Sequence, residues 1–208
     1  MIERLLAAHL YVITPDVAPR RVVELARAAV RGGADLVQLR HKGLARGELL
    51  ALARALRDLT RRGDAIFIVN DHVDIALLSE ADGVHLGPDD LSIASARRIA
   101  GDRLVIGASA SSTTAARAAI AHGASYLGSG PAFATPIKTE KEVIGPEGVA
   151  AIAAAAGPVP VFAIGGIDET NVRQLTTLGL RRACVIRAVA SAADPERATR
   201  RLRAMLMT

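Results

Sequence analysis

The sequence predicts a (β/α)8 TIM barrel, in which eight parallel strands are each followed by a helix, in one domain spanning residues 1–208. Short apolar runs alternate with amphipathic segments of helical length along the whole chain. The eight runs recur about every 26 residues, which fits a barrel of minimal size. Strict alternation predicts a parallel sheet with right-handed crossovers. An open, doubly wound sheet is the alternative, but no Gly-x-Gly-x-x-Gly follows the first run.

The elements follow in order from this alternation. The expected strands are the apolar runs at residues 10–14, 36–39, 65–69, 83–86, 104–107, 126–128, 159–164 and 183–186. The expected helices are the amphipathic segments at residues 20–31, 46–62, 73–80, 92–99, 113–122, 146–156, 169–178 and 195–206. Glycine-containing joints at 32–35, 80–83, 122–125 and 178–180 fit left-handed helix ends that lead into the next strand.

The composition restricts both the core and the function. Half of the residues are hydrophobic, but only 2% are aromatic, with no Trp, 3 Phe and 2 Tyr. This predicts a core of small, branched side chains under helices. It argues against a protein that stacks nucleic-acid bases on aromatic rings.

The charge is basic but dispersed. The chain carries 26 Lys and Arg against 21 Asp and Glu, a net charge of +5. The arginines are spread over the expected helices, which predicts a solvated exterior with neither nucleic acid nor a membrane as partner. Some cations are left for a site that binds a phosphorylated small molecule.

No segment is expected to cross a membrane. Residues 148–167 are uncharged, but Pro158 and Pro160 divide them into a helix and a short strand. The start of the chain lacks a signal-peptide pattern, so we expect a cytoplasmic protein. Cys184 lies in an apolar run and is expected to be a small buried hydrophobe rather than a nucleophile. The sequence leaves open whether the chain forms a homo-oligomer.

Polar residues follow the expected strands where a barrel carries its chemistry. Gln38, Arg40 and Lys42 alternate as the second strand ends, so their side chains should point to one side and converge on an anion. The other interpretation of Arg40 and Lys42 is ordinary surface charge.

Carboxylates follow the next two strands. Asn70 and Asp71 come after the third, and Asp89 and Asp90 after the fourth. Neighbouring strands lie about 4.8 Å apart, so Asp71 and one of the two later aspartates could share an ion. Carboxylate oxygens without clustered Cys or His favour Mg²⁺ bound together with substrate phosphates. The alternative is that Asp71 and Asp90 are helix N-caps.

The later strands add candidates for phosphate binding. Ser109 follows the fifth strand, and residues 130–138 form a long loop that could be a substrate lid or a plain connection. Gly165 and Gly166 follow the seventh strand, where backbone N–H groups could approach a phosphate near a helix N-terminus. The five histidines show no metal-ligand spacing, and His85 is expected to be a satisfied core residue.

These residues together resemble the thiamine-phosphate synthase family. The resemblance runs from one end of the chain to the other, and its specificity lies in the order and spacing of the whole set. The segments that carry it are residues 11–14, 38–42, 70–71, 83–91, 107–109, 130–131, 135–138 and 163–167. The resemblance implies a TIM-barrel transferase that joins 4-amino-2-methyl-5-hydroxymethylpyrimidine diphosphate to a thiazole phosphate, releasing pyrophosphate before the thiazole nitrogen attacks.

The resemblance also implies roles for individual residues. Those expected to hold the pyrimidine diphosphate are Gln38, Arg40, Lys42, Asn70, Ser109 and Lys138, of which Arg40, Lys42, Ser109 and Lys138 would act in catalysis. Those expected at the thiazole phosphate are Thr135, Pro136, Ile137, Gly165, Gly166, Ile186 and Arg187. Asp71 and Asp90 would bind Mg²⁺. Cations and Mg²⁺ can stabilise the charge on departing pyrophosphate, so no protein nucleophile is needed.

Three positions depart from the family's pattern. Ile137 stands where a second threonine is usual, Arg187 where a phosphate-binding serine is usual, and residues 110–112 lack a usual histidine. Arg187 could bind the phosphate through its guanidinium or could crowd the site. Two alternatives follow: a related thiazole tautomerase, which would use a histidine near Ser111, and a non-catalytic sensor of a phosphorylated ligand.

Overall fold

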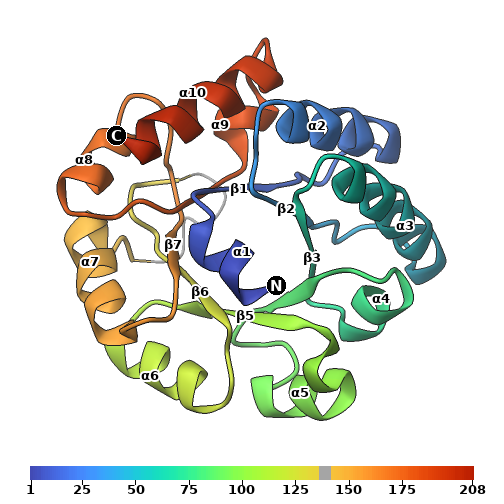
Figure 1. The fold of residues 1–208 in the computed structure, drawn as a ribbon, viewed down its shortest axis with the longest axis horizontal. Helices are drawn as coiled ribbons and strands as arrows, with labels where there is room; N and C mark the ends of the chain where they lie inside the picture. Colours follow the sequence, from blue (N-terminus) through green and yellow to red (C-terminus); the bar gives the residue numbers. More distant parts are fainter. Residues whose placement is uncertain (136–141) are drawn as a thin grey trace.

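The strands form a closed parallel barrel. The computed structural model describes residues 1–135 and 142–208. Its eight strands pair in chain order, and β8 closes the barrel against β1. The helices after the first surround the strands as an outer ring (Figure 1). The predicted TIM barrel is confirmed, and the open, doubly wound sheet is excluded.

The elements agree closely with the apolar periodicity. The strands are β1 (Leu10–Ile13), β2 (Leu36–Leu39), β3 (Ile66–Asn70), β4 (Gly83–Leu86), β5 (Val105–Ala110), β6 (Tyr126–Ser129), β7 (Val161–Ala163) and β8 (Ala183–Val185). The helices are α1 (Ile2–Ala7), α2 (Pro19–Arg31), α3 (Arg46–Arg62), α4 (Val73–Leu78), α5 (Ile93–Ala100), the 3₁₀ turn η1 (Gly101–Arg103), α6 (Thr113–Ala121), α7 (Gly145–Ala156), α8 (Val172–Thr177), α9 (Arg187–Ala190) and α10 (Pro195–Met207).

Three short elements were not predicted, and one helix begins later than expected. The elements α1, η1 and α9 are too short to show a helical period in the sequence. The helix α8 begins at Val172 rather than residue 169, because Asp168 and Asn171 form a hydrogen-bonded turn before it.

The barrel interior is more aromatic than the composition suggested. Tyr11, Tyr126 and Phe162 are at most 1% exposed and pack edge to face inside the barrel, with ring centroids 5.5–5.9 Å apart. The prediction of a core made only of small branched side chains was therefore wrong at its centre. Glycine provides the space: a Cβ at Gly107 would lie 2.1 Å from the Tyr126 ring.

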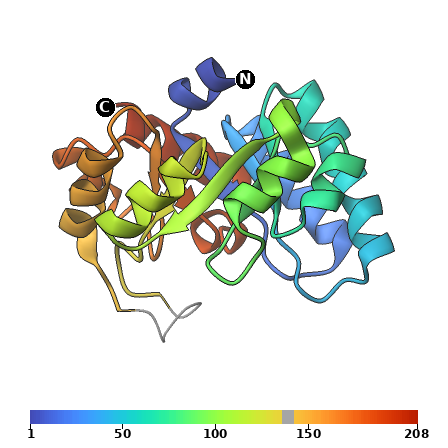
Figure 2. The same ribbon diagram turned by 90° about the horizontal axis from the view of Figure 1, so that it is seen from below.

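One end of the barrel is covered by α1, and the loops that follow the strands lie at the other end (Figure 2). Leu5 and Ala8 are buried in the same cluster as the interior rings. Arg182 Nη2 donates to the Leu6 carbonyl at 2.6 Å and so attaches the helix to β8. This arrangement leaves the carboxyl ends of the strands for a functional site.

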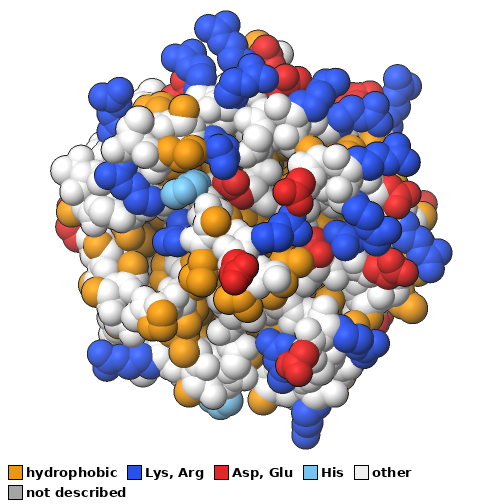
Figure 3. Space-filling view, in the orientation of Figure 1, with side chains coloured by type: hydrophobic (Ala, Val, Ile, Leu, Met, Phe, Trp, Pro, Cys, Tyr) orange, Lys and Arg blue, Asp and Glu red, His pale blue; other side chains and the backbone are white. Residues whose placement is uncertain are grey.

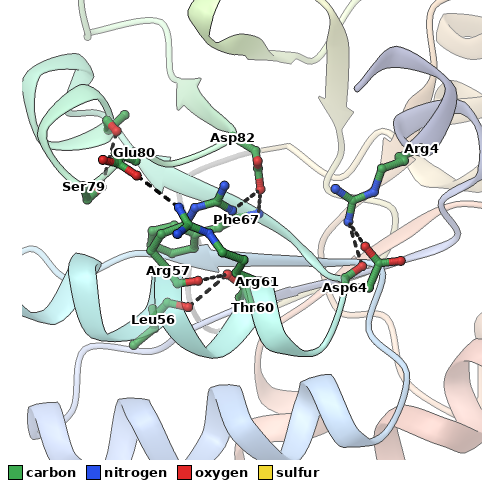
Figure 4. A network of polar contacts seen from close by, with 11 residues as sticks. Arg4, Leu56, Arg57, Thr60, Arg61, Asp64, Phe67, Ser79, Glu80 and Asp82 are labelled. Carbon is green, nitrogen blue, oxygen red and sulfur yellow. Dashed lines mark hydrogen bonds and ion pairs between the residues drawn. The ribbon is translucent and has the colours of Figure 1, made fainter.

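The recurring joints have a shared role at the α1 end of the barrel. Asp35, Asp82 and Ser125 each precede an even-numbered strand, and each accepts from a backbone N–H of the strand before it. Asp82 also pairs with Arg57 of α3 at 2.8 Å, which attaches that helix to the sheet (Figure 4). At this second joint Glu80, at φ 54°, takes the left-handed position expected of glycine, and Gly83 lies inside β4.

The outer surface carries most of the charge. Seen from the α1 side, Lys and Arg side chains are spread over the face and interspersed with Asp and Glu (Figure 3). Many form exposed ion pairs, such as Arg20 with Glu24 and Arg200 with Glu196. Within residues 1–135 and 142–208, no helix combines the length and the apolar character that a bilayer crossing requires.

Candidate active site

A pocket of about 430 Å³ lies inside the barrel at the carboxyl ends of its strands. Tyr11, Gln38, His85 and Cys184 line it from the strands, and residues from the loops after β5 to β8 complete its wall. A larger hollow of about 820 Å³ lies at the α1 end. There Arg97 donates to main-chain carbonyls, which is a structural role, and the predicted site residues lie elsewhere.

The predicted basic triplet is divided between two levels. The Gln38 side chain is buried inside the barrel and donates to the Tyr11 hydroxyl at 2.5 Å. Arg40 and Lys42 lie beyond the strand end, Arg40 half-buried and Lys42 exposed. Their charges both act on Asp71. The structure thus brings the two cations together beside the carboxylates and places Gln38 deeper.

Asp16 holds the two cationic residues in place, and the sequence interpretation missed it. Its carboxylate accepts from Arg40 Nη1 and from the backbone N–H of Lys42, each at 2.6 Å. Burial alone would raise the pKa of Asp16, but the hydrogen bonds from Lys42 and Arg40 outweigh it and lower that pKa. Asp16 follows β1, so the rule that selected residues after the other strands could have found it.

Asp71 and Asp90 form a close carboxylate pair. Asp71 lies just after β3 in the left-handed region at φ 65°, and its N–H donates to the His85 carbonyl at 2.9 Å. Asp90 accepts from the Gly87 N–H at 2.7 Å. Burial first, and then the hydrogen bond and charge of Asp90, raise the pKa of Asp71 from 3.8 to about 6.

The helix-cap alternative for these two aspartates is wrong. The N-cap of α4 is His72, which makes no side-chain capping bond. The N-cap of α5 is Ser92, whose hydroxyl accepts from the Ser95 N–H at 3.1 Å. Asp89 is exposed. Asp71 and Asp90 are therefore free of a capping role.

The pair has the chemistry that a hard divalent cation requires. Two carboxylates that repel each other enough to raise a pKa are neutralised by a cation between them. Among the residues described, no group of three or more His, Cys, Asp or Glu could hold a metal ion. An ion here would take the rest of its shell from water or ligand phosphates, which is the usual arrangement for Mg²⁺.

Polar side chains of β3 to β5 face the interior next to this pair. Asn70 ends β3 and lies opposite His85 in the strand register. His85 is half-buried and lines the pocket, with Nε2 3.0 Å from the Ser109 hydroxyl. It is hydrogen-bonded, as expected, but it belongs to the pocket rather than only to the core. Ser109 lies within β5 rather than after it.

The loops after β6 to β8 form the opposite wall. Thr135, Gly165, Gly166, Ile186 and Arg187 line the pocket. Both glycines have positive φ, and a Cβ at either would lie within 2.6 Å of residues 131–134. The turn of residues 168–171 separates them from α8, so they are not at its N-terminus as the sequence suggested. Pro136, Ile137 and Lys138 lie outside the described residues.

Arg187 and Cys184 differ in what they offer the pocket. Arg187 is exposed at the start of α9, the short extra helix that follows the last strand in many phosphate-binding barrels. Its guanidinium forms no ion pair within the described part of the chain. Cys184 is 3% exposed, and burial raises the pKa of its thiol, as fits a small hydrophobe rather than a nucleophile.

The fold and this pocket define a class: TIM barrels with a pocket at the carboxyl ends of their strands, where the active sites of such barrels lie. The family described as thiamine monophosphate synthase matches residues 10–189. The chain therefore belongs to the thiamine monophosphate synthase family.

Individual relatives agree with this assignment. A thiamine-phosphate synthase of Moorella thermoacetica is 47% identical over 185 residues, covering 88% of each chain. One of Gloeobacter violaceus is 45% identical over 197 residues, which are 94% of this chain but 57% of the relative's length. A solved thiamine phosphate pyrophosphorylase of Pyrococcus furiosus has a TM-score of 0.89 and 41% identity, covering 99% of this chain and 98% of its own. The chain thus spans little more than half of some relatives.

Proposed function

We propose that the chain is a thiamine-phosphate synthase. It would join 4-amino-2-methyl-5-hydroxymethylpyrimidine diphosphate to a thiazole phosphate and release pyrophosphate. The observation that carries the proposal is the Asp71 and Asp90 pair with the charges of Arg40 and Lys42 acting on it, in the loops after β2 to β4 of a member of this family. Two carboxylates for a cation and two cations for phosphate oxygens suit a diphosphate leaving group.

In this reaction the protein would stabilise charge on the leaving group and would form no covalent bond to the substrate. The bond between the pyrimidine methylene carbon and the diphosphate oxygen breaks, and its electron pair leaves with the oxygen. Arg40, Lys42 and Lys138 would stabilise that charge, and Ser109 would donate a hydrogen bond to it. Mg²⁺ held by Asp71 and Asp90 would neutralise the diphosphate. The thiazole nitrogen then forms the new bond to the methylene carbon.

The second substrate would occupy the wall formed after β6 to β8. Thr135, Pro136, Ile137, Gly165, Gly166 and Ile186 would surround its phosphate, with Arg187 as an added cation. A guanidinium matches phosphate geometry better than the hydroxyl of a serine does. This role for Arg187 is supported by its exposure at the pocket wall, which leaves its charge available to a ligand.

The test uses the purified protein with both phosphorylated substrates and follows thiamine phosphate with Mg²⁺ or with a chelator. Product with Mg²⁺ that disappears after chelation supports the proposal. Asp71→Ala and Asp90→Ala should each reduce turnover strongly and change the melting temperature little. Binding of both substrates without turnover would instead identify a sensor of phosphorylated ligands.

A further inference from the structure

A chain of hydrogen bonds crosses the interior of the barrel. Its members come from five strands and are, in order, Gln38, Tyr11, Tyr126, His85 and Ser109. Gln38 Nε2 lies 2.5 Å from the Tyr11 hydroxyl, which lies 2.9 Å from that of Tyr126. The Tyr126 hydroxyl is 3.2 Å from His85 Nδ1, and His85 Nε2 is 3.0 Å from Ser109 Oγ. Gln38, at one end, is buried at the bottom of the pocket, and Ser109, at the other end, is exposed in it.

The donor at the buried end gives the chain a direction. An amide nitrogen only donates, so the Tyr11 oxygen accepts from Gln38 and the Tyr11 proton is directed to Tyr126. The Tyr126 proton is then directed to His85 Nδ1. Burial raises the pKa of both phenols, so both keep the proton that this direction requires.

This direction determines the tautomer of the imidazole and the role of the hydroxyl beyond it. A neutral imidazole whose Nδ1 accepts must carry its proton on Nε2. Nε2 of His85 then donates to Ser109 Oγ. The Ser109 hydroxyl, having accepted this bond, keeps its own proton for another acceptor in the pocket.

The packing around this chain of hydrogen bonds holds the Tyr126 and His85 rings in one arrangement. A Cβ at Gly107 would lie 2.4 Å from the Tyr126 hydroxyl, and a Cβ at Gly128 would lie 3.2 Å from the His85 ring. Both glycines are inside strands, where glycine costs stability and usually marks a close approach. The absence of side chains at Gly107 and Gly128 thus leaves the space that the Tyr126 and His85 rings occupy.

We propose that His85 is a positioning residue, held as the neutral Nε2–H tautomer by Gln38, Tyr11 and Tyr126, and that it fixes the Ser109 hydroxyl as a donor toward the bound ligand. The direction of the chain is a property of the protein alone. The identity of the ligand acceptor, an oxygen of the departing diphosphate, rests on the proposed function.

The tautomer can be measured without substrate. In protein labelled with ¹⁵N-histidine, long-range ¹H–¹⁵N correlation at neutral pH distinguishes the two neutral forms and the imidazolium. His85→Gln identifies the His85 signals, and His122→Gln, on the exterior, is the matched control. We expect protonated Nε2 and unprotonated Nδ1. A proton on Nδ1 would overturn the proposal whether or not the enzyme turns over.

The action through Ser109 is tested by a double-mutant cycle. Tyr126→Phe keeps the ring and removes the hydroxyl that donates to His85 Nδ1. We therefore expect the Nε2–H tautomer of His85 to be no longer the major form, and kcat to fall about tenfold. The same change in a Ser109→Ala background should cost little more than Ser109→Ala alone. Equal losses in both backgrounds would mean that Tyr126 only supports packing, and would overturn the proposal.

A conservative replacement adds a readout that packing alone would not give. His85→Gln keeps an amide donor near the place of Nε2, whereas His85→Leu keeps bulk without a donor. We expect His85→Gln to retain several times the kcat of His85→Leu at similar melting temperature. Equal kcat values in the two variants would contradict the donor role. If no variant or parent turns over, the proposed function has failed, and the tautomer measurement still decides the direction of the chain.

Discussion

The close pair of Asp71 and Asp90 makes a quantitative prediction about stability without metal. The pKa of Asp71 is about 6 in the folded protein, against 3.8 for a free side chain. Between these two values the folded state binds more protons than the unfolded state, so stability falls as the pH rises through this interval. At about 1.4 kcal/mol per pKa unit, the full penalty above pH 6 is about 3 kcal/mol. Asp71 is only partly buried, and solvent screening reduces this to about 1–2 kcal/mol.

Asp71→Asn removes the titrating carboxyl, but asparagine has a similar size and also tolerates a positive φ. In chelator-containing buffer we expect the variant to be about 1–2 kcal/mol more stable than the parent at pH 7. The difference should shrink as the pH falls below 6 and nearly vanish near pH 3, where the parent carboxyl is largely protonated in both states. Urea unfolding from pH 3 to pH 7.5 measures it.

The matched control is Asp89→Asn, because Asp89 is an exposed carboxylate in the same loop as Asp90. Its stability should follow that of the parent at every pH. A stability difference between Asp71→Asn and the parent that is the same at all pH values would refute the argument. At pH 7, added Mg²⁺ should stabilise the parent and leave Asp71→Asn almost unchanged.

Three further predictions concern single contacts. Arg187→Ser should raise KM for the thiazole phosphate about tenfold in steady-state assays and change kcat little, because it removes the proposed charge-assisted hydrogen bond. An unchanged KM would contradict direct contact between Arg187 and the phosphate. Asp16→Asn should raise KM for the pyrimidine diphosphate about tenfold, because it releases Arg40; a change confined to the thiazole KM would place Arg40 elsewhere. Gly107→Ala should lower the free energy of unfolding by about 1–3 kcal/mol in urea titrations, because its Cβ would overlap the Tyr126 ring; Gly47→Ala, in open space on α3, is the control and should not destabilise.

Most of the barrel could be predicted from the sequence because its signals are local. Apolar runs and glycine joints repeat at short range, and the residues after β2, β3 and β4 lie at the same end of any parallel barrel. The short helix α1 gave no such signal, because it is held by burial of Leu5 against distant strands. The sequence also gave no sign that Tyr11 and Tyr126, 115 residues apart, meet inside the barrel.

The sequence was enough to predict which residues belong to the site, but not how their side chains are arranged within it. The rule that polar residues after strands gather at one end placed Asp71 beside Asp90, and it would also have found Asp16. It could not show that Gln38 turns inward to a tyrosine while Arg40 turns to a carboxylate, because these orientations depend on partners from β1 and from the loop after it. Nor could it assign His85 to the pocket, which needs the space left by Gly128.

The three interior rings also determine how ligands can travel. Tyr11, Tyr126 and Phe162 close the pocket from below, and α1 covers the far end of the barrel. Within the described chain, ligands must therefore come and go at the carboxyl ends of the strands. Under the proposed function, both substrates and both products therefore share one opening, so a product that has not left obstructs the entry of the next substrates, which inhibition of the initial rate by each product would show.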